Sequence, residues 1–189
     1  MSAREAIALA ALDLVAAGGV EAVSVRTVAA RAGVSPGSVQ HHYGTKQQLL
    51  VAAVELVGRR VRARLETAAA DADPTERLRT LARQLLPLDD RRRDEARVWL
   101  AFVARAAVDP EIAALHSREW AALQAVFAAL LAARRPGAAA VTPADDDAAA
   151  HLLAVLDGLA VAGIAEDGRM GPDRTSRLLD DLLERWPLS

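Results

Sequence analysis

The sequence predicts an all-α protein with a small N-terminal helix-turn-helix domain and a larger helical body. Three observations predict this class. Apolar residues recur at intervals of three and four along the 189 residues, and no stretch alternates convincingly with a period of two. A proline stands just inside several of the expected helix starts. The stretch from Val25 to Leu50, VRTVAARAGVSPGSVQHHYGTKQQLL, has the layout of two short helices around a tight turn, followed at once by a third.

The helix starts are marked by prolines that follow a capping residue. Proline at the first helical position loses no hydrogen bond, and Ser, Asp or Thr before it is a good N-cap. The five pairs are Ser35-Pro36, Asp73-Pro74, Asp109-Pro110, Thr142-Pro143 and Gly171-Pro172. We therefore expect about nine helices. They lie near residues 3–17, 25–32, 36–42, 46–69, 74–87, 91–108, 110–134, 143–163 and 172–186.

The expected domain boundary falls at the start of the fourth helix. Residues 1–45 form the predicted helix-turn-helix domain, and residues 46–189 form a helical domain for effector binding and dimerisation. The long fourth helix would join the two domains mechanically. Within the second domain, residues 134–147 are the only good loop of any length.

The charge distribution points to an anionic partner for the first domain. The whole chain has a net charge of −2. Residues 24–64 nevertheless hold seven Lys/Arg and one acid, a local charge of +6, whereas residues 65–189 hold 15 Lys/Arg and 21 Asp/Glu. A basic N-terminal segment on an acidic body is the electrostatic pattern of a small DNA-binding domain. Arginines that merely coat a solvated helix would give the same count.

The third helix is expected to bury one face and present the other. Val39 and Tyr43, four residues apart, would pack inward, and Gly33 would supply the positive φ of the turn. Ser35 would cap the helix, and Lys46 lies at the start of the next one, where a helix N-terminus favours phosphate. The outward face carries hydroxyl, amide and imidazole groups that can bond phosphates and base edges. Its residues are Gly37, Ser38, Gln40, His41 and His42.

From Ile7 to about Leu50 the chain resembles the TetR family of bacterial transcriptional regulators. The resemblance rests on VRTVAARAGVSPGSV and HHYGTKQQLL, in order and spacing. It departs at Gln40 and His42, where tyrosine is common in the family, and at Tyr43, where phenylalanine is usual. The resemblance implies base-reading roles for Arg26, Ser38, Gln40 and His41. It implies DNA-backbone contacts for Thr27, Gly37, His42 and Lys46, with Ser35 also in the predicted interface.

The body carries an uneven set of aromatic residues that could line a cavity. The chain has six aromatic residues, and only Tyr43 lies in the first 98 positions. Four others fall within 29 residues. Such a cluster could hold a small apolar or cationic ligand, although large side chains at helical spacing more often fill a core. The candidate pocket residues are Trp99, Phe102, His116, Trp120, Gln124, Phe127 and His151.

The last two helices carry two apolar stripes that suggest a dimer surface. Two such helices from each subunit would pair as a four-helix bundle about a two-fold axis. The same stripes could instead pack inside one subunit. The C-terminal part also resembles, more weakly, the betaine-regulator branch of the family. The candidate dimer residues are Leu152, Leu156, Leu159, Ala160, Gly163, Leu178, Leu182 and Trp186.

Other classes of function find little support in the sequence. There is no cysteine, phosphate-binding glycine loop, HExxH motif or nucleophile elbow, so we expect no enzyme, no cofactor and no metal site. No signal peptide and no membrane span are expected, and the cytoplasm is the expected compartment. The predicted function is a homodimeric repressor that a small-molecule effector releases from double-stranded operator DNA. The alternative is a constitutive DNA-binding protein of the same fold with no ligand.

Overall fold

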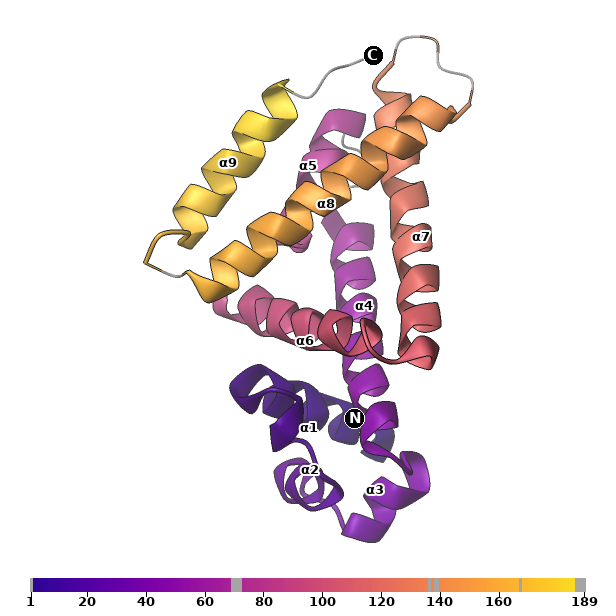
Figure 1. Cartoon of the computed structure of the whole chain (residues 1–189), viewed down its shortest axis with the longest axis vertical. Helices are drawn as coiled ribbons and strands as arrows, with labels where there is room; N and C mark the ends of the chain where they lie inside the picture. Colours follow the sequence, from indigo (N-terminus) through magenta and orange to yellow (C-terminus); the bar gives the residue numbers. More distant parts are fainter. Residues whose placement is uncertain (1, 69–72, 136, 138–139, 167, 186–189) are drawn as a thin grey trace.

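The computed structural model describes residues 2–68, 73–135, 137, 140–166 and 168–185. These residues form nine α-helices and one short 3-10 helix, with no strand among them, and so confirm the predicted fold class (Figure 1). The elements are α1 (Ala3–Gly18), η1 (Val20–Ala22), α2 (Val25–Ala32), α3 (Pro36–His42), α4 (Lys46–Ala68), α5 (Pro74–Gln84), α6 (Asp90–Ala106), α7 (Pro110–Ala133), α8 (Pro143–Ala165) and α9 (Pro172–Arg185).

The predicted capping residues begin the helices as expected. The side chains of Ser35, Asp73, Asp109 and Thr142 each accept hydrogen bonds from backbone N–H groups in the first turn. The predicted ends differ from the structure by at most two residues except at one place: α5 stops at Gln84 rather than at residue 87. Pro87 explains the difference, because proline disfavours the helical conformation in the residue before it. The 3-10 helix was not predicted, and residue 186 lies outside the described part of the chain.

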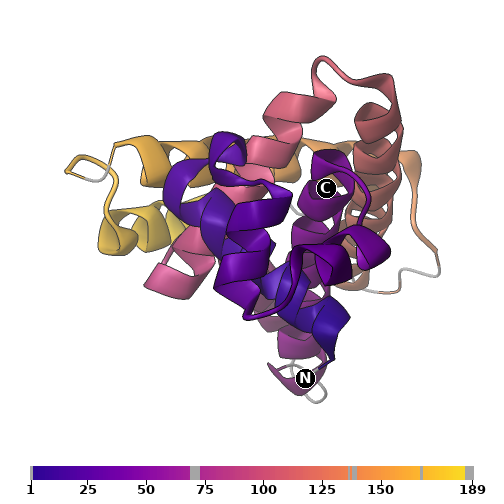
Figure 2. The ribbon, with the colours of Figure 1, turned by 90° about the horizontal axis from the view of Figure 1, so that it is seen from below.

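The helices form a head and a body joined by α4 and α6. In Figure 1, α1, α2 and α3 form the head at the bottom, and α4 runs from it into the body. Helix α6 crosses above α1 and separates the head from α5, α8 and α9. Figure 2, seen from below, shows the head in front of the body, with α2 and α3 on its outer side.

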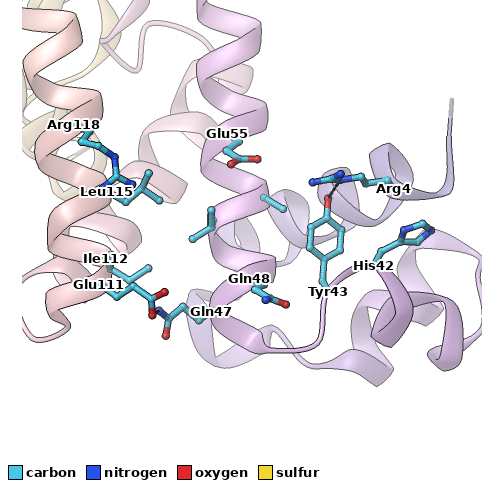
Figure 3. Close-up of a pocket in the computed structure, with 12 residues that line it drawn as sticks. Arg4, His42, Tyr43, Gln47, Gln48, Glu55, Glu111, Ile112, Leu115 and Arg118 are labelled. Atoms are coloured by element: carbon cyan, nitrogen blue, oxygen red, sulfur yellow. Dashed lines mark hydrogen bonds between the residues drawn. The ribbon is translucent and has the colours of Figure 1, made fainter.

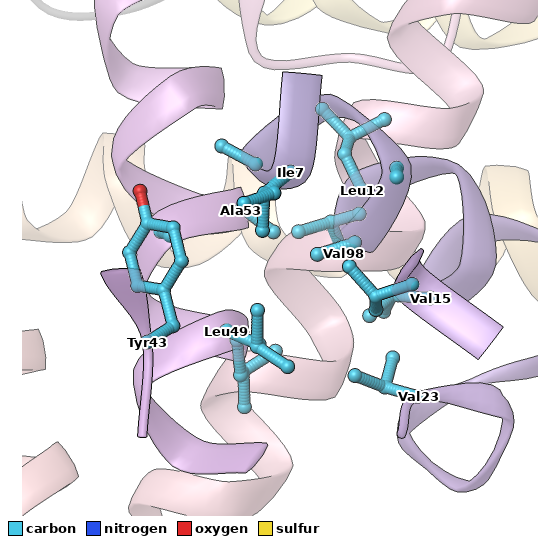
Figure 4. Packing of buried hydrophobic residues seen from close by; sticks show 14 of the residues in the cluster. Ile7, Leu12, Val15, Val23, Tyr43, Leu49, Ala53 and Val98 are labelled. Carbon is cyan, nitrogen blue, oxygen red and sulfur yellow. The ribbon is translucent and has the colours of Figure 1, made fainter. Parts of the chain in front are cut away.

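The first hydrophobic core belongs to the head but extends well beyond residue 45. Ile7, Val28 and Val39 are fully buried in it. Leu49 of α4 belongs to the same cluster as Ile7, and both are shown in Figure 4. Helix α6 adds further buried side chains, among them Val98. The head core is therefore completed by two helices of the body.

A second core holds the body together. It is built from α5, α7, α8 and α9, and its fully buried members include Leu81, Phe127, Leu152 and Leu179. Helix α8 is the one described helix that is long and apolar enough to cross a membrane by length and composition, which is weak support for a membrane span. Leu152 and Leu156 of this helix are buried against the rest of the body.

Candidate nucleic-acid interface and body cavity

The turn between α2 and α3 is fixed by local hydrogen bonds and one glycine. The Ser24 hydroxyl accepts from the Thr27 backbone N–H at 3.1 Å, and the Thr27 hydroxyl accepts from the Ser24 backbone N–H at 2.9 Å. Gly33 ends α2 with φ 68°, as the sequence predicted, a conformation that favours glycine. Ser35 then caps α3 by accepting from the Ser38 backbone N–H at 3.1 Å. The angle between the two helices is thus set by their own sequence.

One face of α3 is anchored in the head, as predicted. Val39 is fully buried and Tyr43 is 7% exposed. The Nε of Arg4 in α1 donates to the Tyr43 hydroxyl at 3.2 Å, and its guanidinium lies 5.7 Å from the ring centroid. Because this face is held by packing and by a hydrogen bond, the opposite face of α3 has a fixed orientation.

The predicted DNA-contact residues lie on or beside that opposite face. Thr27 and Ser38 are half-buried, and the Thr27 hydroxyl also donates to the Ala22 carbonyl at 2.9 Å. Lys46 Nζ lies 3.3 Å from the Glu21 carboxylate, which is almost fully exposed. The exposed members are Arg26, Ser35, Gly37, Gln40, His41, His42 and Lys46. The head therefore presents polar and basic side chains on and beside α3, and His42 also borders the crevice toward α7.

A crevice of about 430 Å³ separates the head from α7. Figure 3 shows the side chains that line it, with the Arg4–Tyr43 hydrogen bond on the head side. Across the crevice, Gln47 Nε2 donates to a Glu111 carboxylate oxygen at 3.0 Å. The lining mixes acids, bases and apolar groups, so the crevice has no clear preference for one class of ligand.

A second hollow, of about 270 Å³, lies in the body between α4, α5, α6 and α7. Trp99 and Trp120, both predicted for a pocket, line it with nearly parallel rings whose centroids are 5.2 Å apart. The remaining wall is largely aliphatic. It includes Val54, Val57, Val61, Leu81, Leu85, Leu123 and Val126.

The other predicted pocket residues do not line this cavity. Phe102 is fully buried in the head core and Phe127 in the body core. His116 stacks on Trp99 and Trp120, with ring centroids at 5.3 and 5.7 Å. Gln124 donates to the Asp146 carbonyl at 3.4 Å, and His151 is exposed on α8.

The polar end of the cavity was not predicted from the sequence. Glu95 lines the cavity with its side chain only 5% exposed. Both of its carboxylate oxygens accept from Arg64, at 3.0 and 2.7 Å, and Arg91 and Arg60 lie at 3.3 and 3.9 Å. Glu95 lies three residues before Val98, on the buried face of α6. A charged residue on an apolar helix face indicates a buried ion pair, because a buried charge needs partners.

A half-buried carboxylate also stands behind the aromatic stack. The Trp99 indole N–H donates to Asp157 of α8 at 3.4 Å. Burial raises the pKa of the Asp157 carboxyl, and this hydrogen bond opposes the rise in pKa only in part. The contact ties the cavity wall to α8.

Several of the predicted dimer residues are instead buried within one subunit. Leu152, Leu156 and Ala160 belong to the body core. A Cβ on Gly163 would lie 2.7 Å from Pro87 Cγ, so this glycine permits a close contact inside the chain. Leu159 and Leu182 are half-buried against the same core, Leu178 is 37% exposed, and Trp186 lies outside the described residues.

The fold and the α2–α3 geometry define a helix-turn-helix protein with a helical second domain. The family model for bacterial regulatory proteins of the tetR family matches residues 7–53, and that for the C-terminal domain of BetI-type transcriptional repressors matches residues 74–186. The chain belongs to the TetR family of transcriptional regulators and has a repressor domain of the BetI type.

Full-length relatives agree with this assignment. The chain is 30% identical over 182 residues to the transcriptional regulator BetI of Rhizobium meliloti, covering 94% of this chain and 86% of that protein. It is 29% identical over 179 residues to the regulator PksA of Bacillus subtilis, covering 93% and 85%. These names describe transcriptional regulators, in line with the expectation of a non-enzymatic role.

Solved structures give the same picture. A transcriptional regulator from Rhodococcus sp. Rha1 matches with a TM-score of 0.85 and 35% identity, over 98% of this chain and 96% of that chain. A putative regulator from Saccharomonospora viridis, solved in complex with choline, matches with a TM-score of 0.80 and 26% identity, over 97% and 96%.

Proposed function

We propose that this chain is a homodimeric cytoplasmic repressor that leaves its operator when a small molecule occupies the body cavity. The observation that carries this proposal is the 270 Å³ cavity, whose wall includes Trp99 of α6. The neighbouring residue Val98 is buried in the head core. One turn of α6 therefore touches both the cavity and the head. The choline held by the Saccharomonospora viridis relative supports small-molecule binding by this fold.

Helix α3 is the proposed DNA-recognition helix. It would enter the major groove, with Ser38, Gln40 and His41 of α3 and Arg26 of α2 reading base edges. Thr27, Ser35, Gly37, His42 and Lys46 would contact the DNA backbone. Two copies in a dimer would lie roughly 34–36 Å apart, in successive major grooves of a near-palindromic operator.

Effector binding would reach the head through α4 and α6. Val54 of α4 lines the cavity and also belongs to the head core. A ligand that fits better when α4 and α6 are displaced would favour a head spacing that does not match the operator. The coupling free energy of such regulators is typically ~1–3 kcal/mol.

The dimer would form through a stripe of α8 that the subunit leaves exposed. Exposed residues recur there at intervals of three and four, and Val155 and Val161 are 39% and 43% exposed. A Cβ on Gly158 would meet nothing within 4 Å, so this position allows close approach of a second helix. The stripe comprises His151, Ala154, Val155, Gly158, Val161 and Ala165. Leu178 of α9 extends it.

A constitutive DNA-binding protein without a ligand is the alternative. That function predicts a body filled tightly around Trp99 and Trp120. A cavity bordered by both side chains favours the effector-responsive function.

Two substitutions in the head test the proposed DNA interface. Gln40→Ala should relax the preference at one base position by ~1–3 kcal/mol. Lys46→Ala should weaken binding to all DNA sequences alike. It should also reduce the slope of log affinity against log salt concentration by about one. Selection of genomic fragments followed by footprinting and salt titration would measure both. Identical effects of the two variants would contradict the assigned roles.

A matched pair in α7 tests the cavity. Ala122 lines it, whereas Ala125, three residues further along, does not. Ala122→Trp should fill the cavity and abolish effector release while operator binding persists. Ala125→Trp should leave release unchanged. Equal responses of the two variants would place the effector elsewhere.

The dimer surface is tested by one substitution at two exposed valines. Val155→Lys should weaken the dimer at least about tenfold, because a lysine would lose hydration in the contact. Val108→Lys is the control, since Val108 is 74% exposed in the turn after α6 and lies outside the stripe. Sedimentation over a range of concentrations would compare them. A dimer unaffected by Val155→Lys would reject this surface.

A further inference from the structure

The charge of the effector can be inferred from the groups around the body cavity. The inference rests on the proposed effector function of this cavity. Most of the wall is apolar, and four ionisable side chains line it. They are Arg62, Arg92, Glu95 and Glu119. Which of them already have partners decides what a ligand would meet.

The buried carboxylate is not available to a cationic ligand. Glu95 receives two hydrogen bonds from Arg64 and has Arg91 and Arg60 within 4 Å. Arg92 is also engaged, because its Nε donates to Asp89 at 2.9 Å and its Nη1 donates to the Arg83 carbonyl at 3.0 Å. The acid deepest in the wall is thus neutralised by arginines of the same subunit.

The tryptophans do not form an open cage for a cation. A cation–π site needs aromatic faces that are free to meet the ligand. Trp99 stacks on Trp120 at 15° and on His116 at 26°, and Phe102 lies 5.6 Å from it. Because the rings of Trp99, Trp120 and His116 are nearly parallel, they do not turn their faces toward one central point as the walls of a cation cage would.

Positive charge is in excess where α4 and α6 meet. Among the described side chains at this end, five arginines stand against three acids, Glu95, Asp89 and Asp90. The five are Arg60, Arg62, Arg64, Arg91 and Arg92. Among the described residues, Arg62 has neither a hydrogen bond nor an ion pair. Glu119 of α7 also lines the cavity, is exposed as Arg62 is, and likewise has no hydrogen bond or ion pair among the described residues. What distinguishes Arg62 is the set of arginines around it on α4 and α6. Asp157 stands behind Trp99, where burial raises the pKa of its carboxyl.

We propose that the cavity binds a small amphipathic anion, a carboxylic acid with an apolar body. The carboxylate would pair with Arg62 in the positive field of the α4–α6 end. The apolar body would lie along the aliphatic wall and the edges of Trp99 and Trp120. A guanidinium suits this role, because it can donate two parallel hydrogen bonds to a carboxylate.

Four probe ligands test whether the cavity prefers a negatively or a positively charged ligand. Three of them, 3-phenylpropionate, 3-phenylpropan-1-ol and 3-phenylpropylammonium, share one apolar body, and choline is the fourth. Calorimetry on the intact protein should show the acid binding at least about tenfold more tightly than the alcohol, and the two cations binding more weakly than the alcohol. The acid alone should release operator DNA at low concentration.

Matched variants on α4 locate the anion. Arg62→Gln should remove the preference for the acid over the alcohol. Arg59→Gln should retain it, because Arg59 is on the same helix, does not line the cavity and pairs only weakly with Glu55 at 3.9 Å. Thermal unfolding without ligand checks that both variants are folded. Glu119→Gln should leave the affinity for the acid unchanged or raise it.

The outcomes separate this inference from the function on which it rests. Equal affinity for the acid and the alcohol, or tighter binding of either cation, overturns the anion assignment and leaves the effector cavity in place. A preference for the acid that survives Arg62→Gln also overturns the assignment. Failure of all four probes to bind or to release DNA contradicts both the anion assignment and the effector function.

Discussion

The head and the body use helices in different ways. The head packs short, capped helices around a core in which Ile7, Val28, Val39 and Leu49 are all fully buried. The body packs longer helices and leaves a hollow of about 270 Å³ beside Trp99. A DNA-binding domain needs a surface of fixed shape, whereas a ligand-binding domain needs a cavity. The difference indicates that tight packing is concentrated where orientation matters.

The largest expected effect contrasts a leucine from each region. Leu49→Ala, in the head core, should destabilise the protein by about 2–5 kcal/mol, because it leaves a cavity in a filled core. Leu85→Ala, on the half-buried cavity wall, should cost only about 1 kcal/mol, since less surface is buried there. Urea denaturation measures both. Equal costs would contradict the difference in packing.

The second effect concerns the polar end of the cavity. Glu95→Gln removes the charge that three arginines share and should cost about 1.5–3 kcal/mol, the range for hydrogen bonds to charged groups. Asp94→Gln is a suitable control, because Asp94 is the adjacent acid and pairs with Arg97 near the surface at 3.2 Å. A larger loss in the control than in Glu95→Gln would count against the buried cluster.

A smaller effect is expected at the start of α8. Thr142→Ala removes the N-cap and should cost ~0.5–2 kcal/mol. The Thr142 hydroxyl, its backbone N–H and Arg135 hold the pKa of Asp145 below its ordinary value. This contribution to stability is present above the unfolded pKa of about 3.9 and is lost as pH falls through the folded pKa. Thr142→Ala should therefore reduce the loss of unfolding free energy between neutral and acidic pH, as measured by denaturation at several pH values.

The smallest effect is expected on the surface of the head. Asp13→Asn breaks the ion pair with Arg31 at 2.8 Å, in which the two side chains are 33% and 59% exposed. Exposed pairs contribute about 0–1 kcal/mol, and salt reduces even that. Thermal unfolding at low and high salt would measure it. A cost above that of Thr142→Ala would show that the head depends on its surface charges.

The sequence was most informative where structure depends on local signals. Prolines after capping residues located the helix starts, and Gly33 located the turn, because each of these effects acts within a few residues. The apolar stripe of α8 was recognised, but its buried face was predicted as the contact surface. Periodicity identifies a stripe without showing what covers it, and Leu152 and Leu156 are covered by other helices of the same chain.

The cavity could be predicted only in part for a similar reason. Trp99 and Trp120 line it, but Phe102 and Phe127 fill two different cores. The aliphatic wall comes from α4, α5 and α7, and its valines and leucines have no sequence feature that distinguishes them from core residues. Which of several apolar side chains borders a hollow depends on how the helices cross, and that depends on contacts between distant parts of the chain.

Helix α6 limits how freely the two halves can be exchanged between proteins. Val98 and Phe102 complete the core that α1 shares with α6, while Trp99 on the same helical turn borders the body cavity. A chimaera cut at residue 45 would deprive the transplanted head of part of its own interior. Modular engineering of such regulators would have to carry this face of α6 along with the head, or rebuild an equivalent one on the recipient.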